Sequence, residues 1–196
     1  MGFELFVALS LFAFVSSITP GPNNLMLMAS GANFGFRRTL PHMMGVGVGF
    51  VVMLFLVGIG LIGIFDAVQY SYVVLKWVSV IYLCWLAWRV ANSAAPSKET
   101  GTGKPFSFFQ AAMFQWVNPK AWSMSLTAIT LYAPDRSLLA VFLVTLVFGL
   151  INLPCVSSWT LLGQKMQILL TNPKRLTAFN YTMAAMLIAT LIPVVL

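Results

Sequence analysis

A six-residue run that cannot continue a helix, TPGPNN at positions 19–24, interrupts the first long apolar stretch of the sequence. Each proline removes a backbone donor and disfavours helix in the residue before it, and the glycine permits unusual dihedral angles. Pro22 suits the first position of a new half-helix. We therefore expect the N–H groups of Asn23, Asn24 and Leu25 to point into the middle of the protein. Together with the positive end of the helix dipole, they can bind a carboxylate there.

A second interruption lies within the apolar stretch Phe106–Tyr132. Asn118 suits the N-cap, Pro119 suits the first helical position, and Lys120 follows just inside the helix. A cation in an apolar stretch is costly, and ionisable groups at membrane depth usually line a substrate path. Lys120 and the two half-helix ends together predict an electropositive site for an α-carboxylate.

The amino group of such a substrate needs carbonyl, amide or aromatic partners. Polar and aromatic side chains near the interruptions are the candidates: Asn23, Asn24, Gln115, Asn152, Trp116 and Trp122. The full set of residues expected to bind substrate is Pro22, Asn23, Asn24, Gln115, Asn118, Lys120 and Asn152. The residues expected to break helices are Pro20, Gly21, Pro22 and Pro119.

These features also have structural interpretations. Proline and glycine commonly kink membrane helices without binding anything, and the ammonium of Lys120 can reach an interface along its aliphatic stem. His42, the single histidine, is a candidate for proton coupling, although a polar residue near the end of a span is more often interfacial. Cys84 and Cys155 have no ligand spacing, so we expect small core residues and no metal site.

The composition decides what kind of element must position these residues. Hydrophobic residues make up 60% of the 196 residues and charged residues only 8%, whereas soluble domains are about 45–50% apolar and about a quarter charged. The sequence therefore predicts an all-α integral membrane protein without a separate soluble catalytic domain. The net charge of +7 comes from basic residues in separate short loops, so we expect membrane lipid as a partner and no nucleic acid.

Apolar stretches of roughly 20 residues predict six membrane-spanning helices. The expected spans are a first one that begins at Phe3 and carries the first interruption, Leu40–Ile64, Ser71–Val90, Phe106–Tyr132, Leu138–Leu162 and Leu176–Leu196. The first and fourth are broken. Residues 1–91 and 106–196 each hold a broken helix followed by two more, with a polar cytoplasmic linker at 92–105. Three spans per half require opposite orientations, which predicts two inverted repeats in one membrane domain.

Basic residues in short loops predict the orientation. One side carries Arg37, Arg38, Arg89, Lys98, Lys104, Lys165, Lys174 and Arg175. The other carries Glu4, Asp66, Asp135 and Arg136, with Lys76 near the outer end of its span. Both termini are therefore expected in the periplasm. We expect no cleaved signal peptide, because the residues before the first span include Glu4 and no lysine or arginine.

Closely spaced glycines predict tight helix packing rather than a nucleotide-binding loop. They are Gly45, Gly47, Gly49, Gly58, Gly60 and Gly63. Such small-residue faces are also compatible with a homodimer.

The energy source and the charge of the cargo follow from what the sequence lacks. It contains no phosphate-binding GxxxxGK[ST] motif, so we expect no cofactor and a gradient as the energy source. All four acidic residues lie at span ends or in loops, which favours a zwitterionic or anionic cargo.

Four motifs, TPGPNN at 19–24, GFRR at 35–38, NPKAW at 118–122 and NLP at 152–154, resemble the LysE/RhtB family of amino-acid exporters. The resemblance covers essentially the whole chain. It is closest to the cysteine/O-acetylserine branch and extends to the homoserine and threonine exporters. It implies gradient-driven export of small neutral amino acids or derivatives across a bacterial inner membrane. The lack of a membrane-embedded acid argues against lysine or arginine as cargo.

Two other functions fit parts of the pattern. Half-helices whose N-termini meet after Asn-Pro turns also occur in passive small-solute channels, which do not concentrate their cargo. A membrane enzyme would need an acid, base or nucleophile constellation, and one histidine without a nearby carboxylate is a poor start. We therefore expect a secondary transporter and not an enzyme.

Overall fold

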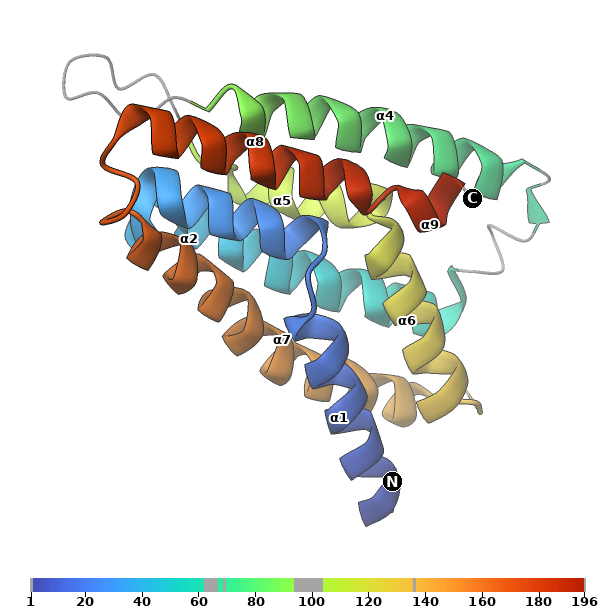
Figure 1. The fold of residues 1–196 in the computed structure, drawn as a ribbon. Helices are drawn as coiled ribbons and strands as arrows, with labels where there is room; N and C mark the ends of the chain where they lie inside the picture. The colour runs from blue at the N-terminus through green and yellow to red at the C-terminus, as the bar shows by residue number, and fades with distance from the viewer. Residues whose placement is uncertain (1, 62–66, 69, 94–103, 136, 196) are drawn as a thin grey trace.

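The computed structural model describes residues 2–61, 67–68, 70–93, 104–135 and 137–195, and the regular elements in these ranges are helices (Figure 1). Some expected features lie outside the described residues: Gly63, Ile64, Asp66, Lys98, Arg136, Leu196 and most of the linker 92–105. The helical class predicted from the composition is confirmed.

The first half of the chain forms α1, a long α2, a short π-helical turn and α4. Their bounds are α1 Phe3–Ile18, α2 Pro22–Leu56, η1 Val57–Leu61 and α4 Ser71–Ala91. Within α2, Gly35 has φ 78° and ψ 168°, a backbone conformation that is essentially reserved for glycine. The segments Pro22–Phe34 and Phe36–Leu61 therefore run in different directions without a loop between them.

The second half begins with a broken helix and continues with two long ones. The bounds are α5 Phe108–Phe114, η2 Gln115–Val117, α6 Pro119–Tyr132, α7 Leu138–Met166, α8 Pro173–Ala189 and α9 Ile192–Val195. The expected sixth span, Leu176–Leu196, is thus not one continuous helix. Pro193 accounts for the interruption, because its ring cannot sit against the carbonyl of Ala189 in a continuing helix.

Several described segments are long and apolar enough to cross a bilayer. They are Phe36–Leu61, Val73–Ala91, Leu138–Met166 and Pro173–Val195, and Phe3–Ile18 with Pro22–Phe34 forms a further, broken candidate bent by 53°. The bend lies at the expected first break. The expected fourth span is divided into α5, η2 and α6, and no span by length and composition is found there in the described residues. Six spans in two inverted repeats therefore stay a prediction.

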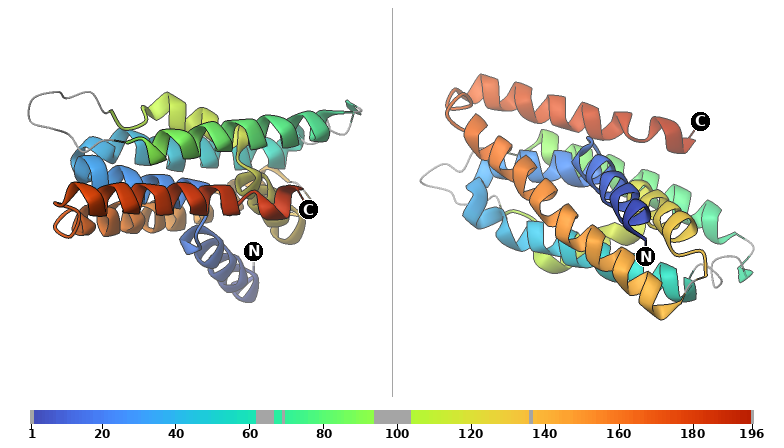
Figure 2. Two further views of the ribbon diagram at one scale, coloured as in Figure 1. Left: turned by 45° about the horizontal axis from the view of Figure 1, so that its top comes forward. Right: turned by 90° about the horizontal axis from the view of Figure 1, so that it is seen from below.

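Helices of the two halves pack against one another in corresponding pairs. The most extensive packing joins α2 to α7, and α4 lies beside α8 (Figures 1 and 2). In addition, α1 packs on α7 while α5 packs on α2. The first helix of each half thus contacts the long helix of the other half.

The glycines of α2 and η1 have different roles. A Cβ on Gly45 would clash with the carbonyl oxygen of Phe108, and one on Gly49 would lie 2.6 Å from the Cα of Ala112. These two positions, and Gly58 against Val141, therefore permit tight packing as expected. The expectation is wrong for Gly47, which has ordinary contacts. It is also wrong for Gly60, which has open space around it and a φ of 116°.

A second glycine contact, between α2 and α7, was not expected. A Cβ on Gly31 would clash with the carbonyl oxygen of Thr160, and one on Gly163 would clash with that of Met28. The two helices therefore approach backbone to backbone at reciprocal positions.

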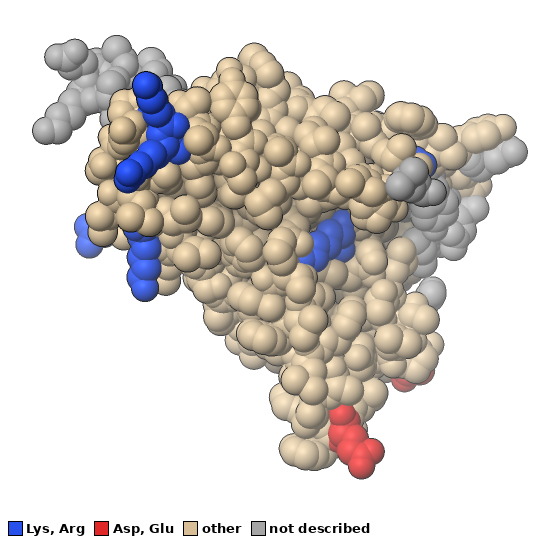
Figure 3. All heavy atoms as spheres, in the orientation of Figure 1, with Lys and Arg blue, Asp and Glu red and all other residues tan. Residues whose placement is uncertain are grey.

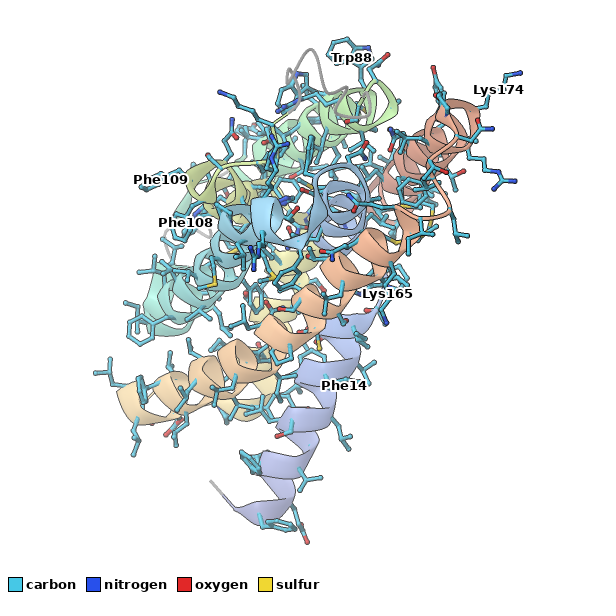
Figure 4. All side chains as sticks on the ribbon, turned by 90° about the vertical axis from the view of Figure 1, so that its left-hand side faces the viewer. Phe14, Trp88, Phe108, Phe109, Lys165 and Lys174 are labelled. Atoms are coloured by element: carbon cyan, nitrogen blue, oxygen red, sulfur yellow. The ribbon has the colours of Figure 1, made fainter. Side chains whose placement is uncertain are left out.

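Apolar side chains cover much of the outer surface, as expected for helices in lipid. Figure 4 shows Phe14 of α1 and Phe109 of α5 pointing away from the bundle, and they are 50% and 75% exposed. Cys84 is exposed on α4, so its expected place in the core is wrong, whereas Cys155 is buried. Charged groups are separated: basic side chains gather at one end of the molecule and acidic ones near the opposite end (Figure 3).

Candidate functional site

The C-terminal end of α1 is the first component of the site, because donors from elsewhere in the protein bind its last carbonyl groups. Asn24 donates from its side-chain amide to the carbonyls of Ser17 and Thr19, both at 2.8 Å. Trp159 of α7 donates its indole N–H to the Ile18 carbonyl at 3.0 Å. A helix end normally leaves such carbonyls without partners, so these bonds fix where the chain leaves α1.

The N-terminus of α2 has no such partners. Its N-cap is Gly21, which has no side chain to accept a bond, and Pro22 at the first position has no N–H. Among the described residues nothing accepts a hydrogen bond from the backbone N–H of Asn23 or Asn24. The N–H of Leu25 donates to the Gly21 carbonyl at 3.0 Å, so the expectation that it is free is wrong.

The N-terminus of α6 differs, because its own side chain caps it. The Asn118 side-chain oxygen accepts from the Lys120 backbone N–H at 3.2 Å. The N–H of Ala121 donates to the Asn118 carbonyl at 3.0 Å, and Pro119 has no N–H. The expectation that both half-helix ends offer free donors is therefore met only at α2.

Lys120 joins the two breaks. Its ammonium donates to the Thr19 carbonyl at 2.8 Å, the Thr19 hydroxyl at 2.9 Å and the Pro20 carbonyl at 3.3 Å. The aliphatic stem lies against Gly21, where a Cβ would approach the Lys120 Cδ to 2.7 Å. The cation therefore lies beside the uncapped N-terminus of α2 and stabilises the negative end of α1.

A second bridge joins the breaks through two amides. The Asn23 amide donates to the Gln115 oxygen at 2.8 Å, and the Gln115 amide donates back at 3.2 Å and to the Ala111 carbonyl at 2.9 Å. Gln115 is 0% exposed. It therefore holds Asn23 in place from η2 and does not itself line the cavity described next.

A small polar cavity lies between the breaks and α7. Six of the expected binding and break residues line it: Gly21, Asn23, Asn24, Asn118, Lys120 and, from α7, Asn152. The Asn152 amide donates to the Ser17 hydroxyl at 3.2 Å, while its side-chain oxygen is buried without a partner. The cavity measures about 20 Å³, roughly the space of one water molecule, so the protein must open to admit a larger molecule.

A wider hollow lies on the other side of the first break. It measures about 570 Å³ and is lined by Pro20, Pro22 and Pro119 together with the α8–α9 corner. Lys120 and Gly21 line both the cavity and this hollow, so the lysine stem forms part of the wall between them. Figure 3 shows a basic patch within a hollow near the middle of the visible face.

Three further candidates lie apart from the cavity. Trp122 is buried and donates its indole N–H to the Trp116 carbonyl at 2.9 Å, and neither ring lines the cavity. His42 is 1% exposed and therefore lies inside the bundle, while the proton-coupling and interfacial interpretations stay predictions. Its ring lies 5.3 Å from that of Phe106, and neither ring nitrogen has a partner.

Two parts of the site, Ser17 and Thr19, were not predicted from the sequence. Ser17 accepts from both Asn24 and Asn152, and Thr19 supplies two of the three acceptors of Lys120. A signal for them was present, since the last turn of any helix exposes carbonyl groups that need donors. The break itself marks where that turn is.

Comparisons with known proteins find a matching family and similar sequences. A family model described as "LysE type translocator" matches residues 14–192. Proteins named "Cysteine/O-acetylserine efflux protein" from Escherichia coli (strain K12) and Shigella flexneri are each 34% identical to this chain over 124 residues. The match spans 62% of this chain and 62% of each relative, which is less than two thirds of their length. No solved structure matches this chain.

Proposed function

The chain belongs to the LysE type translocator family, and we propose that it exports small neutral amino acids or their derivatives from the cytoplasm, driven by an ion gradient. The cargo we propose is of the cysteine/O-acetylserine or homoserine/threonine type. The names of the 34% identical relatives support the first of these. The proposed place of action is a bacterial inner membrane.

The observation that carries the proposal is the position of Lys120 beside the uncapped N-terminus of α2. A substrate carboxylate there would accept from the N–H groups of Asn23 and Asn24 and pair with the Lys120 ammonium. The unpartnered oxygen of Asn152 lines the same cavity and would accept from the substrate ammonium. Both charges of a zwitterion then have partners, and the buried Asn152 oxygen is satisfied.

The packing of the two halves supports alternating access. Because α1 contacts α7 and α5 contacts α2, a movement of one half against the other would change both breaks together. We propose that residues 1–91 and 106–196 act as inverted repeats joined by the linker 92–105. The volume of the cavity, about 20 Å³, favours a transporter over a passive channel, since a channel needs a continuous path that admits its cargo.

The separation of charge supports an orientation with both termini in the periplasm. Lys165 and Lys174 lie at the end of the bundle that would face the cytoplasm (Figures 1 and 4), and the N-terminal end of α1, which carries Glu4, lies at the other (Figure 1). A fusion of alkaline phosphatase to the C-terminus tests this, because the enzyme is active only in the periplasm. An inactive fusion present at full amount would overturn the orientation.

Export itself is tested in a bacterial strain that overproduces the protein, with a panel of extracellular amino acids followed by mass spectrometry. We expect one or a few small neutral amino acids to accumulate outside the cells. An uncoupler and the Lys120→Ala substitution should each abolish the accumulation while the variant remains in the membrane.

Two outcomes would contradict the proposal. Flux that never runs against a gradient and is insensitive to the uncoupler would indicate a channel. Normal efflux by Lys120→Ala would exclude the role given to that lysine while leaving transport itself established.

A further inference from the structure

A second cavity lies toward the end of the bundle where the basic side chains gather. It measures about 330 Å³ and is enclosed by the first segment of α2, by α4, by His42 and by residues 104–106. This volume falls in the range of about 300–1,000 Å³ that small-molecule sites occupy. It is far larger than the 20 Å³ cavity at the breaks, so it has room for a small amino acid without rearrangement.

Two of the buried polar side chains that line this chamber, His42 and Asn33, have atoms without protein partners. His42 is 1% exposed, and neither of its ring nitrogens makes a hydrogen bond. The side-chain oxygen of Asn33, which is 3% exposed, is also unpartnered, although the Asn33 amide donates to Asn180 at 3.1 Å. Buried polar atoms are almost always satisfied in proteins, so orphan groups around a cavity of this size indicate a ligand.

Two positively charged side chains line the chamber. Arg89 lies with its guanidinium 5.0 Å from the ring centre of Trp85 and 5.2 Å from that of Phe106, which holds it at the chamber wall. Lys104 lines the same wall. Within the described part of the chain no carboxylate forms an ion pair with either cation. The chamber therefore combines cations for a carboxylate with acceptors for an ammonium.

One stripe of α2 connects this chamber to the cavity at the breaks. Asn23 lines the cavity, while Met26, Ser30 and Asn33 line the chamber. Their spacing of three, four and three residues places all four on one face of the helix. The distance along the axis from Asn23 to Asn33 is about 15 Å at 1.5 Å per residue.

We propose that this chamber is a loading site on the cytoplasmic side, which binds a small zwitterionic amino acid before it moves along α2 to the breaks. Arg89 and Lys104 bind the carboxylate, and Asn33 and His42 accept from the ammonium. The assignment rests on the proposed export function for its direction. Occupancy of the chamber can nevertheless be measured without transport.

The test uses a cysteine as a reporter at the chamber rim. Asn92 lines the chamber and is exposed, so Asn92→Cys can be labelled with a maleimide once Cys84 and Cys155 are replaced by serine. O-acetylserine, which has no thiol, is the probe. We expect saturating O-acetylserine to slow labelling about tenfold, as a ligand of about 1.4 kcal/mol net stabilisation would.

Controls separate binding in the chamber from other effects. Lys174 points away from the molecule at the same end (Figure 4), and Lys174→Cys should label at a rate that O-acetylserine does not change. Adding Arg89→Gln to Asn92→Cys should remove the protection from labelling by O-acetylserine. Adding Lys104→Gln should do the same, and because Lys104 is exposed, this substitution should not disturb folding. Serine amide, which lacks the carboxylate, should not protect.

Three results would overturn the loading site. The first is an unchanged labelling rate in a protein that exports the amino acid, which leaves the export function intact. The second is protection that survives both charge substitutions. The third is protection by vesicles containing phosphatidylglycerol but not by O-acetylserine, which would show that the cations bind a lipid headgroup. Protection in a protein that fails to export anything would instead contradict the proposed function.

Discussion

The two helix breaks look alike in sequence but present different groups to the cavity between them. At the first break, α2 begins with an uncapped N-terminus, and the carbonyls of Thr19 and Pro20 face outward to accept hydrogen bonds. At the second, Asn118 caps α6 and Lys120 extends a cation across to the first. A proline in an apolar stretch therefore predicts that a helix breaks, whereas the residue before it decides whether the new N-terminus remains free to bind.

In the proposed function, this asymmetry assigns the carboxylate to the first break and the positive charge to the second. Lys120 binds the acceptors at the end of α1 and lies against Gly21, the N-cap of α2, so a single side chain couples the two breaks. The variants below separate those contributions and are ordered by their expected effect on transport.

The largest effect is expected for Lys120→Met, which keeps the length of the side chain but removes its charge and its three hydrogen bonds. Loss of a desolvated charge pair costs about 2–5 kcal/mol, so export should fall about 100-fold or more in Vmax/KM. The measurement is efflux from proteoliposomes. Lys174→Met, an equal loss of charge at an exposed position, is the matched control and should export normally. A similar loss in both variants would indicate a general effect of charge.

A smaller effect is expected from giving α2 the cap that α6 already has. Gly21→Ser places a hydroxyl at the N-cap, where it would accept from the N–H groups of Asn23 or Asn24 in place of the substrate. Gly21→Ala is the control, because its Cβ displaces the Lys120 stem equally without capping. A cap contributes about 1 kcal/mol, so KM should be about fivefold higher for serine than for alanine. Equal KM values would exclude the N-terminus of α2 as the carboxylate site.

A weaker effect is expected for Thr19→Val, which removes one of the three acceptors of Lys120 and keeps the shape of the side chain. The two carbonyl acceptors remain, so the ammonium should stay in place. We expect Vmax/KM to fall about two- to threefold, less than the loss of a complete hydrogen-bonded charge. A loss as large as that of Lys120→Met would show that the hydroxyl, and not the helix end, determines the position of the lysine.

The sequence was sufficient for the parts of the site that depend on local backbone chemistry. Proline and asparagine at 19–24 and 118–120 determine both breaks, and the caps follow from residue type. Trp159 binds a carbonyl at the end of α1 from a position 141 residues away in the sequence. Asn23 and Gln115, which pair through their amides, are 92 residues apart. No pattern in a single sequence specifies such contacts, because they depend on how helices pack.

The same limit explains the error in placing Cys84. Its position along an apolar span was clear, but the face of the helix that it occupies depends on its neighbours. Cys84 faces away from the bundle, whereas His42 is buried against Phe106. An apolar span has little amphipathic pattern from which a buried face can be read, since lipid and core are both apolar.

The smallest effect on transport is expected for Asn118→Ala, and it tests the comparison most directly. The substitution removes the cap of α6 and frees the Lys120 backbone N–H. If both helix ends bound the carboxylate, this new donor would lower KM. Because we assign binding to α2 alone, KM should change less than about twofold, while stability falls by about 1 kcal/mol. Asn118→Ser, which can still cap, should keep the melting temperature of the purified protein near that of the original. A clear decrease in KM for the alanine variant would show that the second break also binds the substrate when its donor is free.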